Sequence, residues 1–221
     1  QSFWPGPLTL LLKKSDRIPD IVTAGSDRVA IRIPNHPLTI ELLNQLDFPL
    51  VAPSANPYTR ISPTNAQQVD LYFGDQIPVV LDGGTCEKGL ESTIVGWEED
   101  QAVVYRLGAL SIEQLESIVG TVRIRNQGEK VLLAPGMTKK HYSPNTPFLV
   151  VENVIEYQAQ HPEQHIGVFL SGNEEPDQVA PGFYARLQEM DEMGFDVLIA
   201  SRLSDQGLGR TINDRLKRAG H

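Results

Sequence analysis

The densest group of chemically useful side chains lies in residues 52–56, which read Ala-Pro-Ser-Ala-Asn. This stretch follows the apolar run 48–51, a pattern typical of a buried strand that ends in a tight turn. In open α/β sheets, ligands bind at such carboxyl ends of strands. The Ser54 hydroxyl and the Asn56 amide are neutral donors and acceptors suited to phosphate or carboxylate oxygens. We therefore take Ser54 and Asn56 as candidate catalytic residues, although Ser and Asn also form ordinary turns.

Three more side chains suit the binding of anions. Arg32 and Arg106 each lie in a run with strand character, and a guanidinium group can hold a carboxylate or a phosphate in bidentate fashion. Ser62 precedes Pro63 at a predicted helix start, where the free backbone N–H groups also attract anions. The alternatives are surface salt bridges for the arginines and a simple helix cap for Ser62.

The elements that must position these groups form two patterns. Up to residue 126, strands and helices are mixed, and two strands form a hairpin across an acidic turn. The predicted strands there are 8–12, 27–34, 48–51, 79–81, 93–97 and 102–107, and the predicted helices are 37–46, 62–72 and 111–119. Beyond residue 147, strands alternate with helices, which predicts a small parallel α/β domain. Its strands are 148–151, 165–170 and 197–200, and its helices are 154–160, 184–193 and 209–218.

Between these patterns, residues 127–146 are rich in Pro and Gly and lack hydrophobic periodicity, which is typical of a linker. We therefore predict a catalytic domain at 1–126, a linker at 127–146 and a C-terminal domain at 147–221. The net charge of the chain is −9, yet the linker carries Lys130, Lys139 and Lys140 against Glu129. A basic connector between two acidic bodies suits contact with a polyphosphate, and the alternative is a solvated linker.

The composition excludes several classes of protein. The hydrophobic content of 40% is that of a globular protein, and no apolar run reaches membrane-spanning length, so we expect no membrane contact. The single cysteine, Cys86, cannot form an internal disulfide, which favours the cytoplasm. The sequence has no metal-ligand spacing, Walker A loop or nucleophile elbow, and we predict no metal site.

An ordered series of short motifs resembles one known family. The series comprises residues 3–9, 32–37, 52–56, 62–64, 81–84, 91–95, 106–108 and 135–142. Together they resemble the threonylcarbamoyl-AMP synthases, the YrdC-like family, in the longer form with an extra C-terminal domain. The resemblance implies an α/β fold with a YrdC-like twisted mixed sheet, N-terminally incomplete, then a linker and a small Rossmann-like parallel domain.

The resemblance also implies an activity and a set of substrates. Family members combine L-threonine, bicarbonate and ATP, with Mg²⁺, into threonylcarbamoyl-adenylate and pyrophosphate, for the threonylcarbamoyladenosine modification of tRNA. Other proteins of tRNA modification are expected partners, and tRNA itself is a weaker one. The implied site residues are, for ATP, Ser54, Ser62, Arg106, His141 and Tyr142, and, for threonine, Arg32, Ala52 and Ser92.

Two departures from the family pattern stand out. Lys139 occupies a linker position where an aromatic residue is usual, and no Lys-x-Arg motif occurs anywhere in the chain. In the family, that motif completes a tetrad with Ser54 and Asn56 and precedes the part present here. We therefore expect this chain to be a fragment of a longer enzyme. The rival hypotheses are an RNA-binding module, a carbamoyl-transfer domain of the same fold and a non-catalytic regulatory relic.

Overall fold

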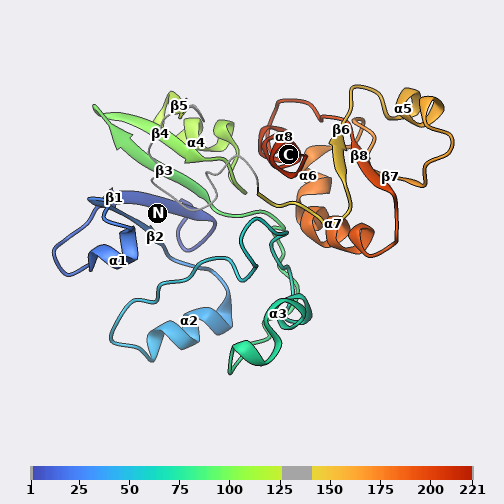
Figure 1. Cartoon of the computed structure of the whole chain (residues 1–221). Coiled ribbons are helices and arrows are strands. Elements are labelled where there is room, and N and C mark those ends of the chain that lie inside the picture. The colour runs from blue at the N-terminus through green and yellow to red at the C-terminus, as the bar shows by residue number, and fades with distance from the viewer. Residues whose placement is uncertain (1, 126–140, 221) are drawn as a thin grey trace. The chain divides into compact units, whose positions relative to one another are not determined.

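The computed structural model of this chain describes residues 2–125 and 141–220, which form two compact units. The first unit comprises Gln1–Pro53 and Glu91–Thr138, and the second comprises Ser54–Leu90 and Lys139–His221. Each unit is thus built from two stretches of chain that are far apart in sequence, as the colours of Figure 1 show.

The first unit is a mixed sheet with short helices. Its elements are β1 (Leu8–Lys13), α1 (Asp20–Thr23), β2 (Arg28–Arg32), α2 (Pro37–Asn44), β3 (Thr93–Glu98), β4 (Gln101–Arg106), α4 (Ile112–Val119) and β5 (Val122–Ile124). The strand order is β2-β1-β3-β4-β5. The β1–β2 and β3–β4 pairs are antiparallel, whereas the β1–β3 and β4–β5 pairs are parallel.

The hairpin of β3 and β4 forms the centre of this unit because both of its faces are buried. Side chains alternate between the two faces of a strand. Val103 and Tyr105 accordingly pack in one apolar cluster, while Ala102 and Val104 pack in another that includes Leu115 of α4. The hairpin predicted from the sequence is confirmed.

Helix α4 begins directly after Ser111, which is its N-cap, as the sequence predicts. The Ser111 side chain accepts a hydrogen bond from the Gln114 backbone, and the Gln114 side chain accepts one from the Ser111 backbone. This reciprocal capping box satisfies two N–H groups that the first helical turn leaves without helical partners.

The second unit is a small parallel domain together with the stretch Ser54–Leu90. Its elements are α3 (Ala66–Phe73), η1 (Gly74–Gln76), β6 (Phe148–Val150), α5 (Val154–Gln160), β7 (Ile166–Leu170), α6 (Pro176–Val179), η2 (Ala180–Gly182), α7 (Phe183–Asp191), β8 (Val197–Ala200) and α8 (Gly209–Ala219). The sheet has the order β6-β8-β7, and both strand pairs are parallel. The predicted α/β class, with a mixed sheet followed by a parallel one, is confirmed.

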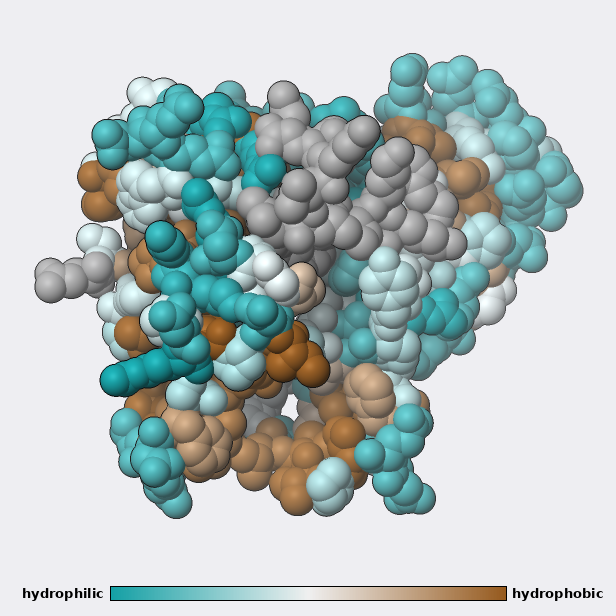
Figure 2. Space-filling view, turned by 60° about the vertical axis from the view of Figure 1, so that its left-hand side comes forward, coloured by the Kyte–Doolittle hydropathy of each residue, from teal (hydrophilic) through white to brown (hydrophobic). Residues whose placement is uncertain are grey.

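The strands predicted at 48–51 and 79–81 are wrong. Neither run forms a strand, and their apolar side chains are exposed: Val51 and Val79 are each 69% exposed. An extended segment becomes part of a sheet only through backbone pairing, and no described strand pairs with either run. Figure 2 shows apolar side chains gathered at the surface in the lower part of that view.

The start of the helix predicted at 62–72 is also corrected. Helix α3 begins at Ala66, and its N-cap is Asn65, whose side chain accepts a hydrogen bond of 2.9 Å from the Gln68 backbone. The Gln68 side chain turns back to accept a bond of 2.6 Å from the Thr64 backbone. Asn is as good a cap as Ser, and these contacts place the N-cap three residues beyond Ser62.

Most of the linker predicted at 127–146 lies outside the described residues, and the domain boundaries drawn from it stay a prediction. At its end, His141, Tyr142 and Ser143 are buried. None of the helices in the described ranges is long and apolar enough to cross a membrane.

Candidate functional site

In the first unit, the structure brings Arg106 and Ser92 into direct contact. The Arg106 Nη2 donates to the Ser92 carbonyl oxygen at 2.9 Å and lies 3.1 Å from the Ser92 Oγ. The Arg106 Nε also donates to the same carbonyl, at 3.3 Å. The resemblance assigned Arg106 to ATP and Ser92 to threonine, and the two sets therefore meet at the Ser92 backbone and hydroxyl.

A third residue, Thr9, joins this contact, although its residue type and position predicted no role for it. Its Oγ1 lies 2.6 Å from the Ser92 Oγ, and both residues are buried. Thr9 lies inside the motif at residues 3–9, and no other feature of the sequence pointed to Thr9 as a site residue. The Ser92 hydroxyl is thus held between a hydroxyl and a guanidinium group.

Gly108 makes this arrangement sterically feasible. A Cβ on Gly108 would lie 2.4 Å from the Glu91 carbonyl oxygen and 2.5 Å from the Ser92 carbonyl carbon. Real Cβ atoms essentially never approach backbone so closely. The motif 106–108 therefore needs glycine at its third position for the chain to pass directly behind Ser92.

Arg32 lies at the same level of the sheet as this contact. Thr9 is the register partner of both Arg32 on β2 and Ile94 on β3, and Ile94 is the partner of Arg106 on β4. Both arginines therefore stand on one row across four strands. Arg32 is exposed and donates from its Nε to the Gly6 carbonyl at 2.9 Å, and Ala52 is exposed in irregular chain.

In the second unit, Asn56 and Ser62 belong to one loop, residues 56–62, hereafter the 56–62 loop. The Asn56 Nδ2 donates to the carbonyls of Pro57 and Arg60, at 2.9 and 3.2 Å. Ser62 is buried, at 8% exposure, and its neighbour Ile61 at 2%. Ser54 precedes the loop and is exposed.

The His141–Tyr142 pair lies against this loop. The next residue, Ser143, donates its backbone N–H to the Thr59 carbonyl at 2.9 Å and forms a parallel bridge with Arg60. Tyr142 is 1% exposed and belongs to the same apolar cluster as Ile61. The structure thus brings together four predicted ATP or catalytic residues, Asn56, Ser62, His141 and Tyr142, on two adjoining stretches of the second unit.

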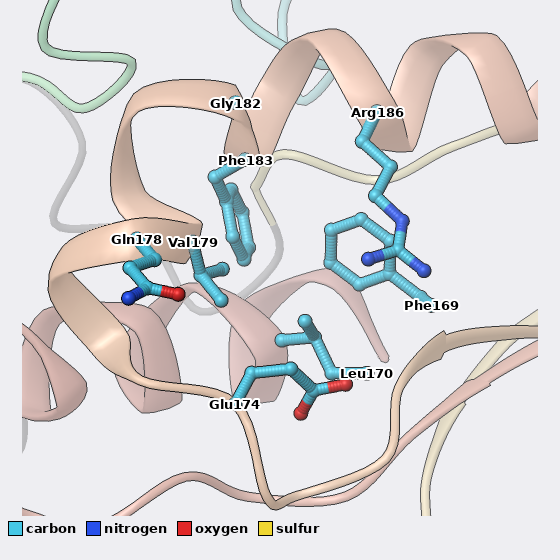
Figure 3. A pocket seen from close by; sticks show the side chains of 8 residues that line it. All are labelled: Phe169, Leu170, Glu174, Gln178, Val179, Gly182, Phe183 and Arg186. Atoms are coloured by element: carbon cyan, nitrogen blue, oxygen red, sulfur yellow. The ribbon is translucent and has the colours of Figure 1, made fainter.

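A pocket in the second unit contains none of the predicted site residues. It has a volume of 220 Å³, and Figure 3 shows apolar side chains, among them Phe169 and Phe183, with charged groups at its margin. The Arg186 guanidinium lies 5.6 Å from the centre of the Phe169 ring. Burial raises the pKa of Glu174, but hydrogen bonds from Ser171 and Gly172 outweigh burial and lower it overall. Because these bonds occupy its carboxylate, Glu174 stabilises the turn after β7.

The described residues contain no group of three or more His, Cys, Asp or Glu that could hold a metal ion. The gathered polar groups are hydroxyls, one amide and guanidinium groups. Such groups hold anionic oxygens by hydrogen bonding and charge. The fold is that of an α/β protein, and its candidate site residues offer neutral and cationic hydrogen-bond donors.

Comparisons with known proteins identify the family. The Sua5/YciO/YrdC family model, described as "Telomere recombination", matches residues 1–108, and the model of the threonylcarbamoyl-AMP synthase C-terminal domain matches residues 110–220. The threonylcarbamoyl-AMP synthase of Pyrococcus abyssi is 35% identical over 98% of this chain and 71% of its own length. That of Bacillus subtilis is 34% identical over 98% of this chain and 70% of its own length.

A solved structure agrees with these matches. The crystal structure of P. abyssi Sua5 complexed with L-threonine superimposes with a TM-score of 0.90 at 35% identity, covering 99% of this chain and 72% of that one. This chain belongs to the threonylcarbamoyl-AMP synthase family, a family of nucleotidyltransferases.

Proposed function

We propose that this chain carries the substrate-binding groups of an enzyme that joins L-threonine, bicarbonate and ATP into threonylcarbamoyl-adenylate and pyrophosphate. The observation that supports this most strongly is the likeness to threonylcarbamoyl-AMP synthases over both units, combined with the Arg106–Ser92 contact. A guanidinium group fixed by a backbone carbonyl is already oriented for phosphate or carboxylate oxygens.

The residues take the following roles in the proposal. Arg32 holds the carboxylate of threonine beside Ala52, while the Ser92 hydroxyl hydrogen-bonds the substrate. Arg106 faces the phosphates of ATP, which Ser54, Asn56 and Ser62 also bind. His141 and Tyr142 support the nucleotide from the linker side.

In the reaction, the threonine nitrogen takes up the carbon of bicarbonate, with loss of water, to form a carbamate. A carbamate oxygen then attacks the α-phosphorus of ATP, and the bond from that phosphorus to the oxygen bridging to the β-phosphate breaks. Pyrophosphate leaves with the electron pair. Because negative charge develops on phosphate oxygens, fixed donors such as Arg106 lower the barrier to this step.

Mg²⁺ enters the proposal only as a counter-ion of ATP. Proteins usually bind Mg²⁺ through one or two carboxylates together with substrate phosphates. The site residues that the structure describes offer no carboxylate and do not fit a protein-held ion. We derive no catalytic step from it.

The product implies further partners. Threonylcarbamoyl-adenylate is a mixed anhydride, and its threonylcarbamoyl group must be transferred to an acceptor. We propose that other proteins carry out this transfer, to an adenosine of tRNA. A cytoplasmic location is proposed with it, on the ground that the chain carries one cysteine, Cys86, which is free and exposed.

The proposal is tested by pyrophosphate release from the full-length protein that contains this sequence. Release should require L-threonine, bicarbonate and ATP together, and it should stop when any one is omitted. Mass spectrometry should find threonylcarbamoyl-adenylate. Release that continues without threonine, or a product formed from carbamoyl phosphate instead of threonine and bicarbonate, would contradict the proposal.

A further inference from the structure

Arg215 on α8 is a charged side chain in an unusual place. It is 0% exposed, which makes it the largest fully buried side chain among the described residues. Its Nη1 lies 2.5 Å from the Asp214 Oδ2, which also accepts from the Arg218 Nε at 2.9 Å. Burying an ion pair rarely adds stability over an apolar side chain of similar size. Stability alone is therefore a poor explanation for Arg215.

What Arg215 contacts suggests another explanation. Its guanidinium carbon lies 4.8 Å from the centre of the Tyr142 ring, within the range of a cation–π interaction. The Tyr184 ring stacks on Tyr142 at 5.4 Å, and the His141 backbone N–H donates to the Arg218 carbonyl at 3.3 Å. Helices α7 and α8 thus hold Tyr142 through its ring and its neighbouring backbone.

Tyr142 needs such support because its backbone lies in the left-handed region, with φ at +64°. A bulky residue other than glycine rarely adopts this conformation, and it persists only where surrounding contacts impose it. The conformation sets the direction in which the chain continues into Ser143. The position of the Tyr142 ring therefore fixes the position of the backbone at Ser143.

The backbone at Ser143 contacts the 56–62 loop directly. The Ser143 N–H donates to the Thr59 carbonyl, and Arg60 and Ser143 form a bridge. The Arg60 carbonyl in turn accepts from the Asn56 Nδ2. A second connection runs in parallel: the Arg60 guanidinium donates to the Asn145 side chain, which Asp191 of α7 holds at 3.0 Å.

We propose that Arg215 is a positioning residue for the 56–62 loop, acting through the Tyr142 ring and the Ser143 backbone. The C-terminal helices then serve the reaction by fixing the loop that carries Asn56 and Ser62. This inference rests on the proposed function for its kinetic consequence, but its structural part stands on the contacts within the second unit.

The test compares three variants of the full-length protein. Arg215→Met keeps an apolar chain of similar length, and Asp214 retains Arg218. Arg215→Lys keeps the charge but loses the planar group that covers the ring. Ile199→Ala is the control, because Ile199 is also 0% exposed in the same unit but belongs to a different apolar cluster from Tyr142.

We expect Arg215→Met to raise the KM for ATP about tenfold, with the KM for threonine unchanged, because a misplaced loop loses contacts to one substrate. Arg215→Lys should fall between wild type and Arg215→Met. In hydrogen exchange, peptides covering 57–64 and 141–146 should lose protection in Arg215→Met. Ile199→Ala should lower the melting temperature and leave both peptides and the KM for ATP near wild type.

Two outcomes overturn the inference. One is an Arg215→Met variant with wild-type exchange at 57–64. The other is an Ile199→Ala variant that raises the KM for ATP as much as Arg215→Met does, since the effect would then follow stability alone. If wild type releases no pyrophosphate with all three substrates, the proposed function fails instead, and the exchange experiment still decides on the positioning role.

Discussion

At the scale of single residues, the Ser92 hydroxyl is the point where a residue proposed for threonine meets one proposed for ATP. It lies between the Thr9 hydroxyl at 2.6 Å and the Arg106 guanidinium at 3.1 Å. A hydroxyl can donate one hydrogen bond and accept others. Ser92 can thus accept from Arg106 and donate to Thr9 or, in the function proposed above, to an oxygen of threonine.

Replacing this hydroxyl should weaken the use of threonine without unfolding the protein. For Ser92→Ala we expect kcat/KM for threonine to fall roughly tenfold or more, because a hydrogen bond in a buried site is lost and Thr9 loses a partner. Steady-state pyrophosphate release at varied threonine measures this. Ser117→Ala, which alters an exposed serine on α4, is the matched control. Unchanged kcat/KM in a folded Ser92→Ala protein would restrict Ser92 to a structural role.

The sequence predicted Ser92 and Arg106 as site residues, but it did not predict that Ser92 contacts Arg106 and Thr9. Residue type and motif order were sufficient to select Ser92 and Arg106. The Thr9–Ser92 contact spans 83 positions and depends on the parallel pairing of β1 with β3. Hydrophobic periodicity predicts that a strand exists but does not choose its partner, so Thr9 received no role.

At the scale of elements, the β3–β4 hairpin is closed by a group of charged and polar side chains. The Glu98 carboxylate accepts a hydrogen bond from the Tyr105 hydroxyl at 2.6 Å and forms an ion pair with Arg123 at β5. The hydrogen bond from Tyr105 and the nearby Arg123 and Arg125 lower the pKa of Glu98. Burial and the same hydrogen bond raise the pKa of Tyr105.

These shifts predict how the hairpin depends on pH. A carboxyl group whose pKa is lower in the folded state stabilises the fold above its unfolded pKa, and this contribution is lost as the pH falls through the folded value. We therefore expect Glu98→Gln to lower the free energy of unfolding at pH 7. The difference from wild type should shrink as the pH falls below the ordinary carboxyl pKa. Urea unfolding at a series of pH values measures it, and a difference independent of pH would contradict the ionic role of Glu98.

Two elements that the sequence predicted correctly, the β3–β4 hairpin and helix α4, depend only on residues close along the chain. The hairpin is joined by a two-residue turn, and α4 is capped by the residue directly before it, Ser111, together with Gln114 in its first turn. Residues 48–51 and 79–81 have strand composition, yet the described part of the chain gives them no strand to pair with. Composition alone could not reveal this, because pairing is a property of the surrounding structure.

At the scale of the whole molecule, both units are discontinuous in sequence. Ile61 shows this most clearly, since it is 2% exposed in an apolar cluster formed chiefly by residues after 141. The prediction of domains from a linker at 127–146 assumed that each body is one continuous stretch. Among the compact units, Ser54–Leu90 groups with the C-terminal half of the chain, while the boundaries predicted at 126 and 147 stay a prediction.

This division predicts which regions respond to a core substitution. Ile61→Ala should destabilise the second unit by about 2–5 kcal/mol through loss of buried contacts and the cavity left behind. In hydrogen exchange, protection should fall in α7 and α8 while β3 and β4 keep theirs. Ile94→Ala, which is equally buried in the first unit, should give the reverse pattern. Equal loss in both units after either substitution would mean that the chain unfolds as one body.

The alternation of the chain between its units also has a consequence for synthesis on the ribosome. Residues 54–90 emerge well before the helices that cover Ile61, and the intervening residues 91–138 belong to the other unit. The ribosome adds roughly 5–20 residues per second, so on the order of ten seconds pass between the synthesis of the 56–62 loop and that of α7 and α8. During that interval its apolar side chains are open to chaperones and proteases, so the loop that carries Asn56 and Ser62 is among the last parts of the molecule to mature.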